Sequence, residues 1–228
     1  MAFMGERIQL FASASIKFFM GLLLVGVMIF PPAGTLHYPC GWLFMAVLFV
    51  PMFIAGMVML FRSPELLKKR LNAKEKEAEQ KSVVALSGIM FVAAFVVAGL
   101  NYRYSWVVMP SWVVWSAVAV FMLSYIMYAE VLRENVYLSR TIEVQENQRV
   151  IDTGLYGIVR HPMYSATVFL FLSMPLVLGS LLSFVIMLAY IPIIAKRVRN
   201  EEDILLKGLD GYAGYCRKVR YRIMPFVW

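Results

Sequence analysis

Long uninterrupted apolar stretches constrain this chain more than any other feature of its sequence. A helix needs about 20 consecutive apolar residues to cross a hydrocarbon core of roughly 30 Å. Four stretches meet that requirement, at about Ile8–Phe30, Gly41–Phe61, Val83–Asn101 and Trp106–Ala129. Hydrophobic residues make up 61% of the 228 residues and charged residues only 16%, whereas soluble domains have about 45–50% and about 25%. We therefore expect an all-α integral membrane protein.

A fifth apolar block, Ser165–Ala195, is divided by Gly179-Ser180. Each half has about 15 residues, which at about 1.5 Å per residue is short for an independent span. We expect the block to form a tight helical hairpin that is either re-entrant or packed against the other helices. The predicted fold is therefore about four transmembrane helices followed by a C-terminal helical hairpin.

Lysine and arginine are distributed unevenly between the connecting segments. The segment between the second and third spans and the polar chain after Arg133 are both basic, whereas Arg103 stands alone between spans three and four. By the positive-inside rule the basic segments are cytoplasmic, which places both termini in the cytoplasm. Ser63-Pro64-Glu65 is a typical helix start, and it predicts an amphipathic helix over residues 64–81 at the cytoplasmic membrane surface.

The segment Thr153–Tyr164, TGLYGIVRHPMY, has the densest chemistry in the chain. Proline suits the first turn of a helix, so Pro162 marks a helix start. Arg160 and His161 directly precede that start, where free N–H groups carry a partial positive charge. The segment therefore predicts an anion or cofactor site at a membrane edge.

A hairpin brings its two ends together, so the residues before and after the fifth apolar block should meet. Arg197 and Glu201 share one face of a helix at i, i+4 spacing. An ordinary exposed pair of this kind is worth only about 0.3–0.5 kcal/mol. We instead expect charged and aromatic side chains to converge at one cytoplasmic mouth and to surround a polar cofactor. They are Arg160, His161, Tyr164, Arg197, Glu201 and Glu202.

Cysteine and histidine exclude other classes of site. Cys40 and Cys216 fall on opposite sides of the membrane in this topology, which excludes a disulfide between them. His37 and His161 are separated in the same way, and no metal-ligand spacing occurs. We expect no metal site and no nucleic-acid partner. The expected partners are membrane lipids and a lipid-like acceptor.

The motif and its surroundings resemble the isoprenylcysteine carboxyl methyltransferase-like membrane enzymes, which are relatives of the phospholipid methyltransferases. The resemblance rests on the succession of TGLYGIVRHPMY, the apolar hairpin and RNEEDILLKGLDGYAGYCRKVRYRIMP. The upstream segments RSPELLKKRL and RENVYLS also resemble the family. It covers most of the chain after about Arg62. On this basis residues 1–132 are expected to form the transmembrane region, and residues 133–228 the catalytic, cofactor-binding region.

The resemblance implies a methyltransferase that uses S-adenosylmethionine and takes its acceptor, such as a prenylcysteine-like carboxylate, from the bilayer. Arg197 and Asn135 would contact the acceptor. The residues implied to bind the cofactor are Gln148, Arg149, Val150, Ile151, Tyr156, Arg160, His161, Pro162, Met163, Tyr164, Glu201 and Glu202. Gln148 stands where the family is expected to carry a histidine.

The identity of the acceptor decides which residues are catalytic. A carboxylate needs no general base, and Arg197 could hold it by a bidentate pair. A lipid amine or a small thiol must first lose a proton, and His161 would then be the candidate base. A structural role for His161, capping its helix and binding cofactor, is the favoured interpretation.

Two other functional classes remain open. An NADPH-dependent membrane reductase of the sterol or enoyl type carries a similar stretch, usually RHPNY followed by Gly-Glu, whereas this chain has Met163 and Ser165-Ala166. A non-enzymatic membrane scaffold is the other class, and it leaves the converging charges unexplained.

Overall fold

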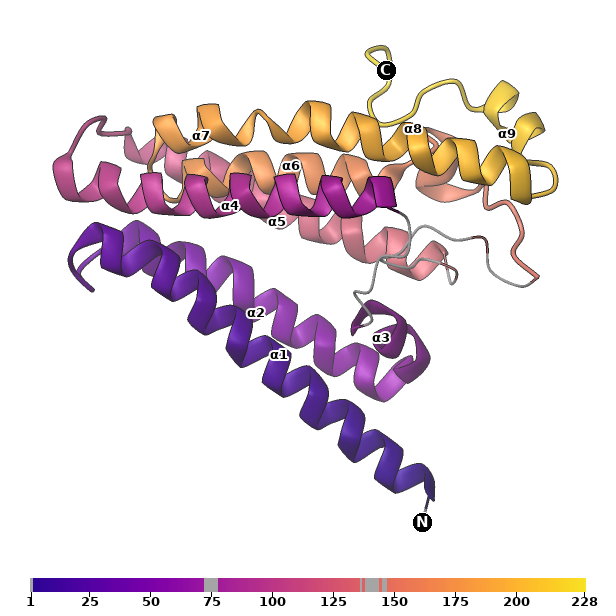
Figure 1. The fold of residues 1–228 in the computed structure, drawn as a ribbon, viewed down its shortest axis with the longest axis horizontal. Helices are drawn as coiled ribbons and strands as arrows, with labels where there is room; N and C mark the ends of the chain where they lie inside the picture. Colours follow the sequence, from indigo (N-terminus) through magenta and orange to yellow (C-terminus); the bar gives the residue numbers. More distant parts are fainter. Residues whose placement is uncertain (1, 72–77, 136, 138–143, 145–146) are drawn as a thin grey trace.

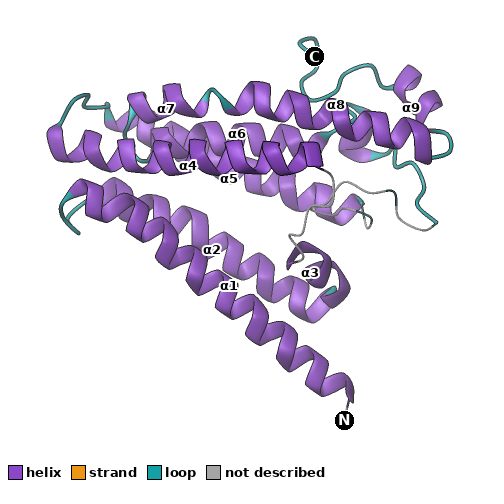
Figure 2. Cartoon of the chain, viewed as in Figure 1, coloured by secondary structure: helices purple, strands orange, loops and turns teal. Residues whose placement is uncertain are grey.

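The computed structural model describes residues 2–71, 78–135, 137, 144 and 147–228 (Figure 1). Every regular element within these residues is a helix, as predicted (Figure 2). The helices are α1 (Ala2–Ala33), α2 (Pro39–Arg62), α3 (Pro64–Leu71), α4 (Ala78–Tyr104), α5 (Ser111–Glu134), the 3-10 helix η1 (Gly154–Gly157), α6 (Pro162–Val177), α7 (Leu181–Met187), α8 (Tyr190–Gly208) and α9 (Tyr212–Lys218).

The helices form a bundle and an arm. In the bundle, α5 packs along α6, and α4 packs along α7 and α8. The arm consists of α1 and α2, which pack against each other and lean away from the bundle on the side of the N-terminus (Figure 1). Helix α1 contacts α4, so the arm is joined to the bundle mainly through these two helices.

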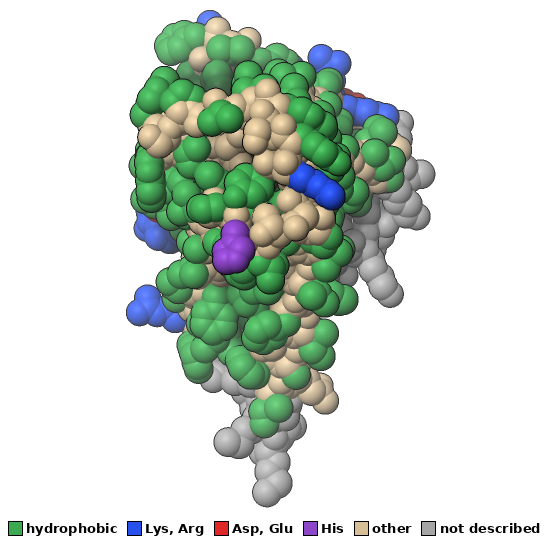
Figure 3. Space-filling model, turned by 90° about the vertical axis from the view of Figure 1, so that its left-hand side faces the viewer, with side chains coloured by type: hydrophobic (Ala, Val, Ile, Leu, Met, Phe, Trp, Pro, Cys, Tyr) green, Lys and Arg blue, Asp and Glu red, His purple; other side chains and the backbone are tan. Residues whose placement is uncertain are grey.

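The bundle has two chemically different ends. The connections α1–α2, α4–α5 and α6–α7 lie together at one end, which we call the turn end (Figure 1). The start of α6 at Pro162 lies at the opposite end, which we call the motif end. Figure 3 looks onto the turn end and shows mainly hydrophobic side chains with few charged ones.

Within the described part of the chain, five helical stretches are long and apolar enough to cross a membrane. The four predicted spans correspond to Ile8–Ala33, Pro39–Arg62, Ser82–Tyr104 and Ser111–Glu134. The fifth stretch, Leu181–Gly208, comprises α7 and α8 and has 28 residues, so the prediction that both halves of the hairpin are too short is wrong for the second half. The reason is that α8 continues past the apolar block into the polar sequence that ends at Gly208. Helix α6, with 16 residues, remains short.

The predicted hairpin is present and packs against the other helices. Its turn contains Gly179 at φ +71°, a left-handed conformation that glycine adopts without steric cost. The hydroxyl of Tyr38 donates a hydrogen bond to the Leu178 carbonyl, and the Gly179 carbonyl lies 3.4 Å from Nδ2 of Asn101. Because Tyr38 and Asn101 belong to the turn end, the hairpin runs the whole length of the bundle.

Within residues 64–81, where one amphipathic helix was predicted, the structure describes α3 over Pro64–Leu71 and the start of α4 from Ala78. Residues 72–77 lie outside the described part of the chain. Lys17 of α1 donates a hydrogen bond of 2.7 Å to the Leu71 carbonyl. This contact joins the last turn of α3 to the arm.

Close approach of the backbones holds the arm against the bundle. A Cβ atom on Gly99 of α4 would lie only 2.5 Å from the Ile29 carbonyl oxygen of α1. Small residues permit this proximity, which favours helix association in membranes. The buried core beside this contact includes Phe44, Phe95 and Phe121.

Candidate functional site

The motif predicted from the sequence lies in a short loop before α6. Residues Gly154–Gly157 form the 3-10 helix η1, and Tyr156 within it is buried. Helix α6 begins at Pro162, as predicted, with His161 in the N-cap position. The His161 side chain makes no capping hydrogen bond, so the expectation that it caps its helix is wrong. Its ring instead faces two glutamates of α8.

Backbone hydrogen bonds tie this loop to the segment after α9. The amide of Arg160 donates to the Tyr221 carbonyl at 2.9 Å, and the amide of His161 donates to the Arg222 carbonyl at 2.8 Å. Farther along, the Ser165 hydroxyl donates to the Ile223 carbonyl at 2.5 Å. Residues 221–223 therefore hold the backbone of the motif in place.

Glu202 is the centre of a buried ionic cluster. Its Oε1 accepts a hydrogen bond from Arg160 Nε at 2.7 Å, and its Oε2 accepts one from Arg222 Nε at 2.7 Å. Arg160 Nη1 also donates to the carbonyls of Val219 and Arg220, both at 2.8 Å. We call Arg160, Glu202 and Arg222 the ionic cluster. Its buried charges are paired and hydrogen-bonded, as burial requires.

His161 links the ionic cluster to a neighbouring pocket. Its Nε2 lies 3.2 Å from Glu202 Oε1, and its Nδ1 lies 3.8 Å from Glu201 Oε1. A carboxylate only accepts hydrogen bonds, so Nε2 carries the proton in the bond to Glu202. The Nδ1 edge of the ring is thereby turned toward Glu201.

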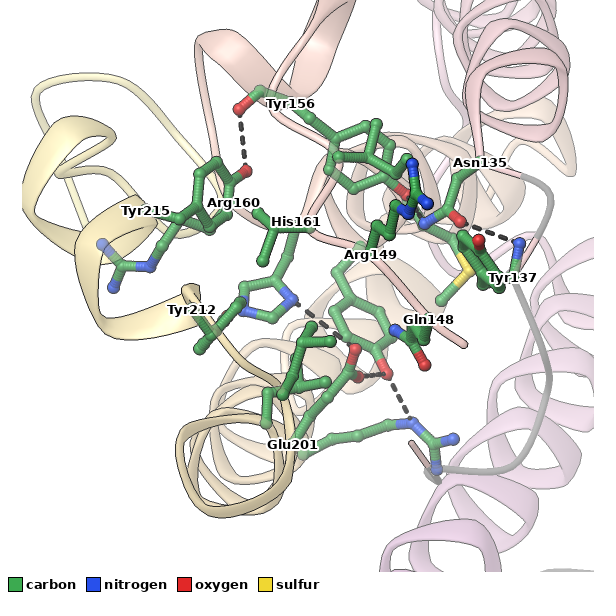
Figure 4. Close-up of a pocket in the computed structure, with 17 residues that line it drawn as sticks. Asn135, Tyr137, Gln148, Arg149, Tyr156, Arg160, His161, Glu201, Tyr212 and Tyr215 are labelled. Atoms are coloured by element: carbon green, nitrogen blue, oxygen red, sulfur yellow. Dashed lines mark hydrogen bonds and ion pairs between the residues drawn. The ribbon is translucent and has the colours of Figure 1, made fainter. Parts of the chain in front are cut away.

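Arg197, Tyr164 and Glu201 form a polar wall of the pocket. The Tyr164 hydroxyl accepts a hydrogen bond from Arg197 Nε at 3.0 Å and donates one to Glu201 Oε2 at 2.5 Å. The predicted pairing of Arg197 and Glu201 on one helix face therefore includes a tyrosine from α6 between them (Figure 4).

Tyr156 connects the end of α5 with α9 on two further sides of the pocket. Its hydroxyl accepts a hydrogen bond from Asn135 Nδ2 at 2.9 Å, and its carbonyl accepts one from the Tyr215 hydroxyl at 2.7 Å (Figure 4). Burial raises the pKa of Tyr156 to about 12, although the Asn135 hydrogen bond acts in the opposite direction. The hydroxyl is therefore neutral at physiological pH.

Most of the predicted site residues line this one pocket. They are Asn135, Gln148, Arg149, Val150, Ile151, Tyr156, Arg160, His161, Met163, Tyr164, Arg197 and Glu201. Pro162 and Glu202 were predicted with them, but neither is on the lining. Pro162 is buried at the start of α6, and Glu202 is turned into the ionic cluster.

The pocket also has lining residues that were not predicted. They are Tyr137, Leu205, Leu209, Tyr212 and Tyr215. Leu209, Tyr212 and Tyr215 pack with Val150 in a small apolar cluster. A signal for α9 was present in the sequence: Gly208 and Gly211 favour a helix break, and two tyrosines follow at i, i+3 spacing, on one helix face. In the structure Gly211 is the N-cap of α9, with φ +83°.

The segment that builds these walls has recognisable relatives. Residues 134–207 match the model of the isoprenylcysteine carboxyl methyltransferase (ICMT) family. The resemblance inferred from the motif is thereby confirmed over this segment, and the match supports a membrane methyltransferase. The matched residues run from the end of α5 almost to the end of α8, and they include both sides of the polar wall.

A second relative comes from the other functional class considered above. The chain is 32% identical over 91 residues to the Delta(14)-sterol reductase TM7SF2 of Mus musculus. The shared segment is 39% of this chain but only 22% of that protein. The chain therefore matches less than a quarter of the length of this relative.

Proposed function

We propose that this protein is a methyltransferase that transfers a methyl group from S-adenosylmethionine to a lipophilic, membrane-embedded acceptor such as a prenylcysteine-like carboxylate. The support is a convergence: the RHPMY motif, the Gln148–Ile151 segment and the polar face of α8 line one pocket. Nearly all of these residues belong to the segment that matches the ICMT family.

The lining of the pocket suits this cofactor. One end carries the Glu201 carboxylate and its Tyr164 partner, which favours a ligand with a positive charge. The other end is apolar and aromatic, and it contains the buried Tyr212 hydroxyl, which has no hydrogen-bond partner among the described residues. A nucleoside joined to a charged amino acid matches these two ends. S-adenosylmethionine supplies an electrophilic methyl group on a sulfonium.

The residues of the chain contribute position and exclusion of water. Methyl transfer is an in-line displacement, which is accelerated by holding donor and acceptor together away from solvent. In this proposal Glu201 faces the cationic donor, and Arg197 holds an acceptor carboxylate on the opposite side of Tyr164. Asn135 fixes the Tyr156 hydroxyl near the acceptor. His161 needs to take a proton only if the acceptor is an amine or a thiol.

The sterol reductase relative favours a second candidate, an NADPH-dependent membrane reductase. NADPH carries several phosphate charges, which require positive partners. Of the arginines on the pocket wall, Arg160 is already bonded to Glu202 and to two carbonyls, and the Glu201 carboxylate would repel phosphate. These charges favour the cationic sulfonium over the anionic dinucleotide.

Cofactor choice is the direct test of the proposal. Purified protein should be stabilised against thermal unfolding by S-adenosylhomocysteine and not by NADPH. Incubation with radiolabelled S-adenosylmethionine and a membrane extract should then label a lipophilic acceptor. Stabilisation by NADPH alone would overturn the methyltransferase proposal in favour of the reductase.

We also propose that the motif end and both termini face the cytoplasm, because the turn end carries few positive charges. Single cysteines at the exposed positions Lys68 and Arg103 can be labelled with a membrane-impermeant reagent in intact cells, after Cys40 and Cys216 are replaced by serine. Only the cysteine at position 103 should react. Labelling of both positions from the same side would contradict the topology.

A further inference from the structure

Tyr212 is a pocket residue to which neither the motif nor the family resemblance gives a role. Its side chain is buried, with 4% relative exposure, and it lines the same pocket as His161 (Figure 4). Its hydroxyl makes no hydrogen bond of ordinary geometry within the described chain. A buried hydroxyl without a partner is costly and uncommon in folded proteins, so its retention at a cavity wall points to a ligand.

The Tyr212 hydroxyl is a neutral donor. Burial, and then the nearby negative charge of Glu202, raise the pKa of Tyr212 above its usual range. The Cys216 thiol lies one turn later on α9 and interacts with this hydroxyl, but a thiol is a weak hydrogen-bonding group. The hydroxyl therefore retains a proton to donate to an acceptor atom in the pocket.

Tyr215 provides an internal comparison three residues later on the same short helix. Its side chain is also buried, with 6% relative exposure, and it also lines the pocket. However, the Tyr215 hydroxyl donates a hydrogen bond of 2.7 Å to the Tyr156 carbonyl. One tyrosine of α9 is thus satisfied by the fold, and the other is not.

The surroundings of Tyr212 indicate which part of a ligand it meets. Tyr212 packs with Leu209 and Tyr215, and Val150 and Leu205 pack against them, so this end of the pocket is apolar. The charged side chains Arg197 and Glu201 are on the polar wall formed by α6 and α8. A flat, mostly apolar group with a few acceptor atoms, such as a purine nucleoside, fits the α9 end.

We propose that the α9 end of the pocket binds the adenosine part of the cofactor and that the Tyr212 hydroxyl donates a hydrogen bond to it. This inference rests on the proposed function, because it takes the ligand to be S-adenosylmethionine. It assigns to α9, which lies beyond the family-matched segment, a direct part in ligand recognition.

Two single-atom deletions test the assignment. Tyr212→Phe and Tyr215→Phe each remove one hydroxyl and keep the ring. Thermal unfolding of each variant is measured without ligand, and its affinity for S-adenosylhomocysteine and for 5′-methylthioadenosine is measured by calorimetry. The second ligand lacks the amino-acid part and reports on the adenosine site alone.

Tyr212→Phe should leave unfolding without ligand unchanged or shift it to higher temperature, because no hydrogen bond is lost. It should weaken both ligands by the same factor, about three- to ten-fold, which corresponds to one neutral hydrogen bond. Tyr215→Phe should lower the unfolding temperature, because it leaves the Tyr156 carbonyl without this donor.

Three outcomes would overturn the inference. Unchanged affinity of Tyr212→Phe for both ligands would show that the hydroxyl meets no ligand atom. A loss for S-adenosylhomocysteine alone would move Tyr212 to the amino-acid end. If the wild-type protein binds neither ligand, the proposed function itself fails, and this result is distinct from the other two because it is seen before any substitution.

Discussion

The two ends of the helix bundle both contain buried and partly buried hydrogen bonds, but the bonds differ in kind. At the turn end they are neutral and separate: Tyr38 donates to Leu178, and Asn101 exchanges two bonds with Val107, of 3.0 and 3.1 Å. At the motif end one carboxylate, Glu202, serves Arg160, His161 and Arg222 together. A separate neutral hydrogen bond can be removed without affecting the others. Removal of a carboxylate that several groups share leaves all of these groups without their partner at once.

At the motif end, the carboxylate that stabilises the fold is a different one from the carboxylate that faces the pocket. The Glu202 carboxylate is turned away from the pocket wall, and Glu201, the next residue, is on it. Two adjacent carboxylates of α8 thus have different surroundings, one in the ionic cluster and one facing the pocket. Substitutions at the two positions should therefore differ in kind as well as in size.

The largest expected effect is that of Glu202→Gln. This change leaves the buried Arg160 guanidinium and Arg222 without their counter-charge, and breaking a buried ion pair typically costs about 3–5 kcal/mol. We expect a large fall in thermal stability in detergent, measured without ligand. Asp203→Asn is the matched control, because Asp203 is exposed on the same helix, and it should have little effect. Equal effects for the two variants would contradict the ionic cluster.

The second prediction compares Glu201→Gln with Arg197→Ala. Losing a charge-assisted hydrogen bond costs about 1.5–3 kcal/mol, or roughly ten- to a hundred-fold in affinity. Glu201→Gln should weaken S-adenosylhomocysteine by that amount. Arg197→Ala should leave this affinity nearly unchanged and abolish transfer, since Arg197 is assigned to the acceptor. Calorimetry together with a transfer assay measures both, and equal weakening of the ligand by the two variants would show that the division of roles is wrong.

The third prediction tests whether packing, as well as hydrogen bonding, holds the turn end together. Gly99→Ala places a methyl group against the Ile29 carbonyl, and overpacking of this kind costs about 1–3 kcal/mol. Gly88→Ala on the same helix meets no atom within 4 Å and should be neutral or slightly stabilising, because alanine favours helices. Thermal unfolding of both variants measures the difference. An unchanged unfolding temperature for Gly99→Ala would mean that α1 can move away from α4 without loss of stability.

The smallest expected effect is that of Tyr38→Phe at the turn end. It removes one neutral buried hydrogen bond, worth about 0.5–1.5 kcal/mol. Tyr102→Phe is the control, because Tyr102 is exposed and donates to the His37 carbonyl, and its effect should be smaller still. Both changes should leave S-adenosylhomocysteine affinity unaltered. A change in affinity for either variant would contradict the separation of the two ends.

The helical architecture followed from local sequence signals. Apolar runs of sufficient length predicted the first four spans, Gly179-Ser180 predicted the hairpin turn, and Pro162 predicted the start of α6. The convergence of Arg160 and Glu201 followed from the hairpin alone, because a chain that reverses direction brings its ends together. These features depend on residues close in sequence or on one simple reversal.

The features that could not be predicted depend on helix rotation and on backbone groups. Glu201 and Glu202 are neighbours, and only the packing of α8 decides which of them faces the pocket. The acceptors for Arg160 include the carbonyls of Val219 and Arg220, and no side-chain pattern marks a carbonyl. The absence of a capping hydrogen bond from the His161 side chain could not be predicted either, because its ring contacts Glu202, which lies 41 positions later in the sequence.

The separation in sequence between Arg160 and its counter-charge has a consequence for biosynthesis. Arg160 precedes Glu202 by 42 positions, and at about 5–20 residues per second the ribosome needs about 2–8 s to make that stretch. During this interval Arg160 stands as an uncompensated cation directly before α6. In the proposed topology, we expect this transient charge to keep the beginning of α6 on the cytoplasmic side while the hairpin inserts. The same arginine would then first direct topology and only later become part of the ionic cluster.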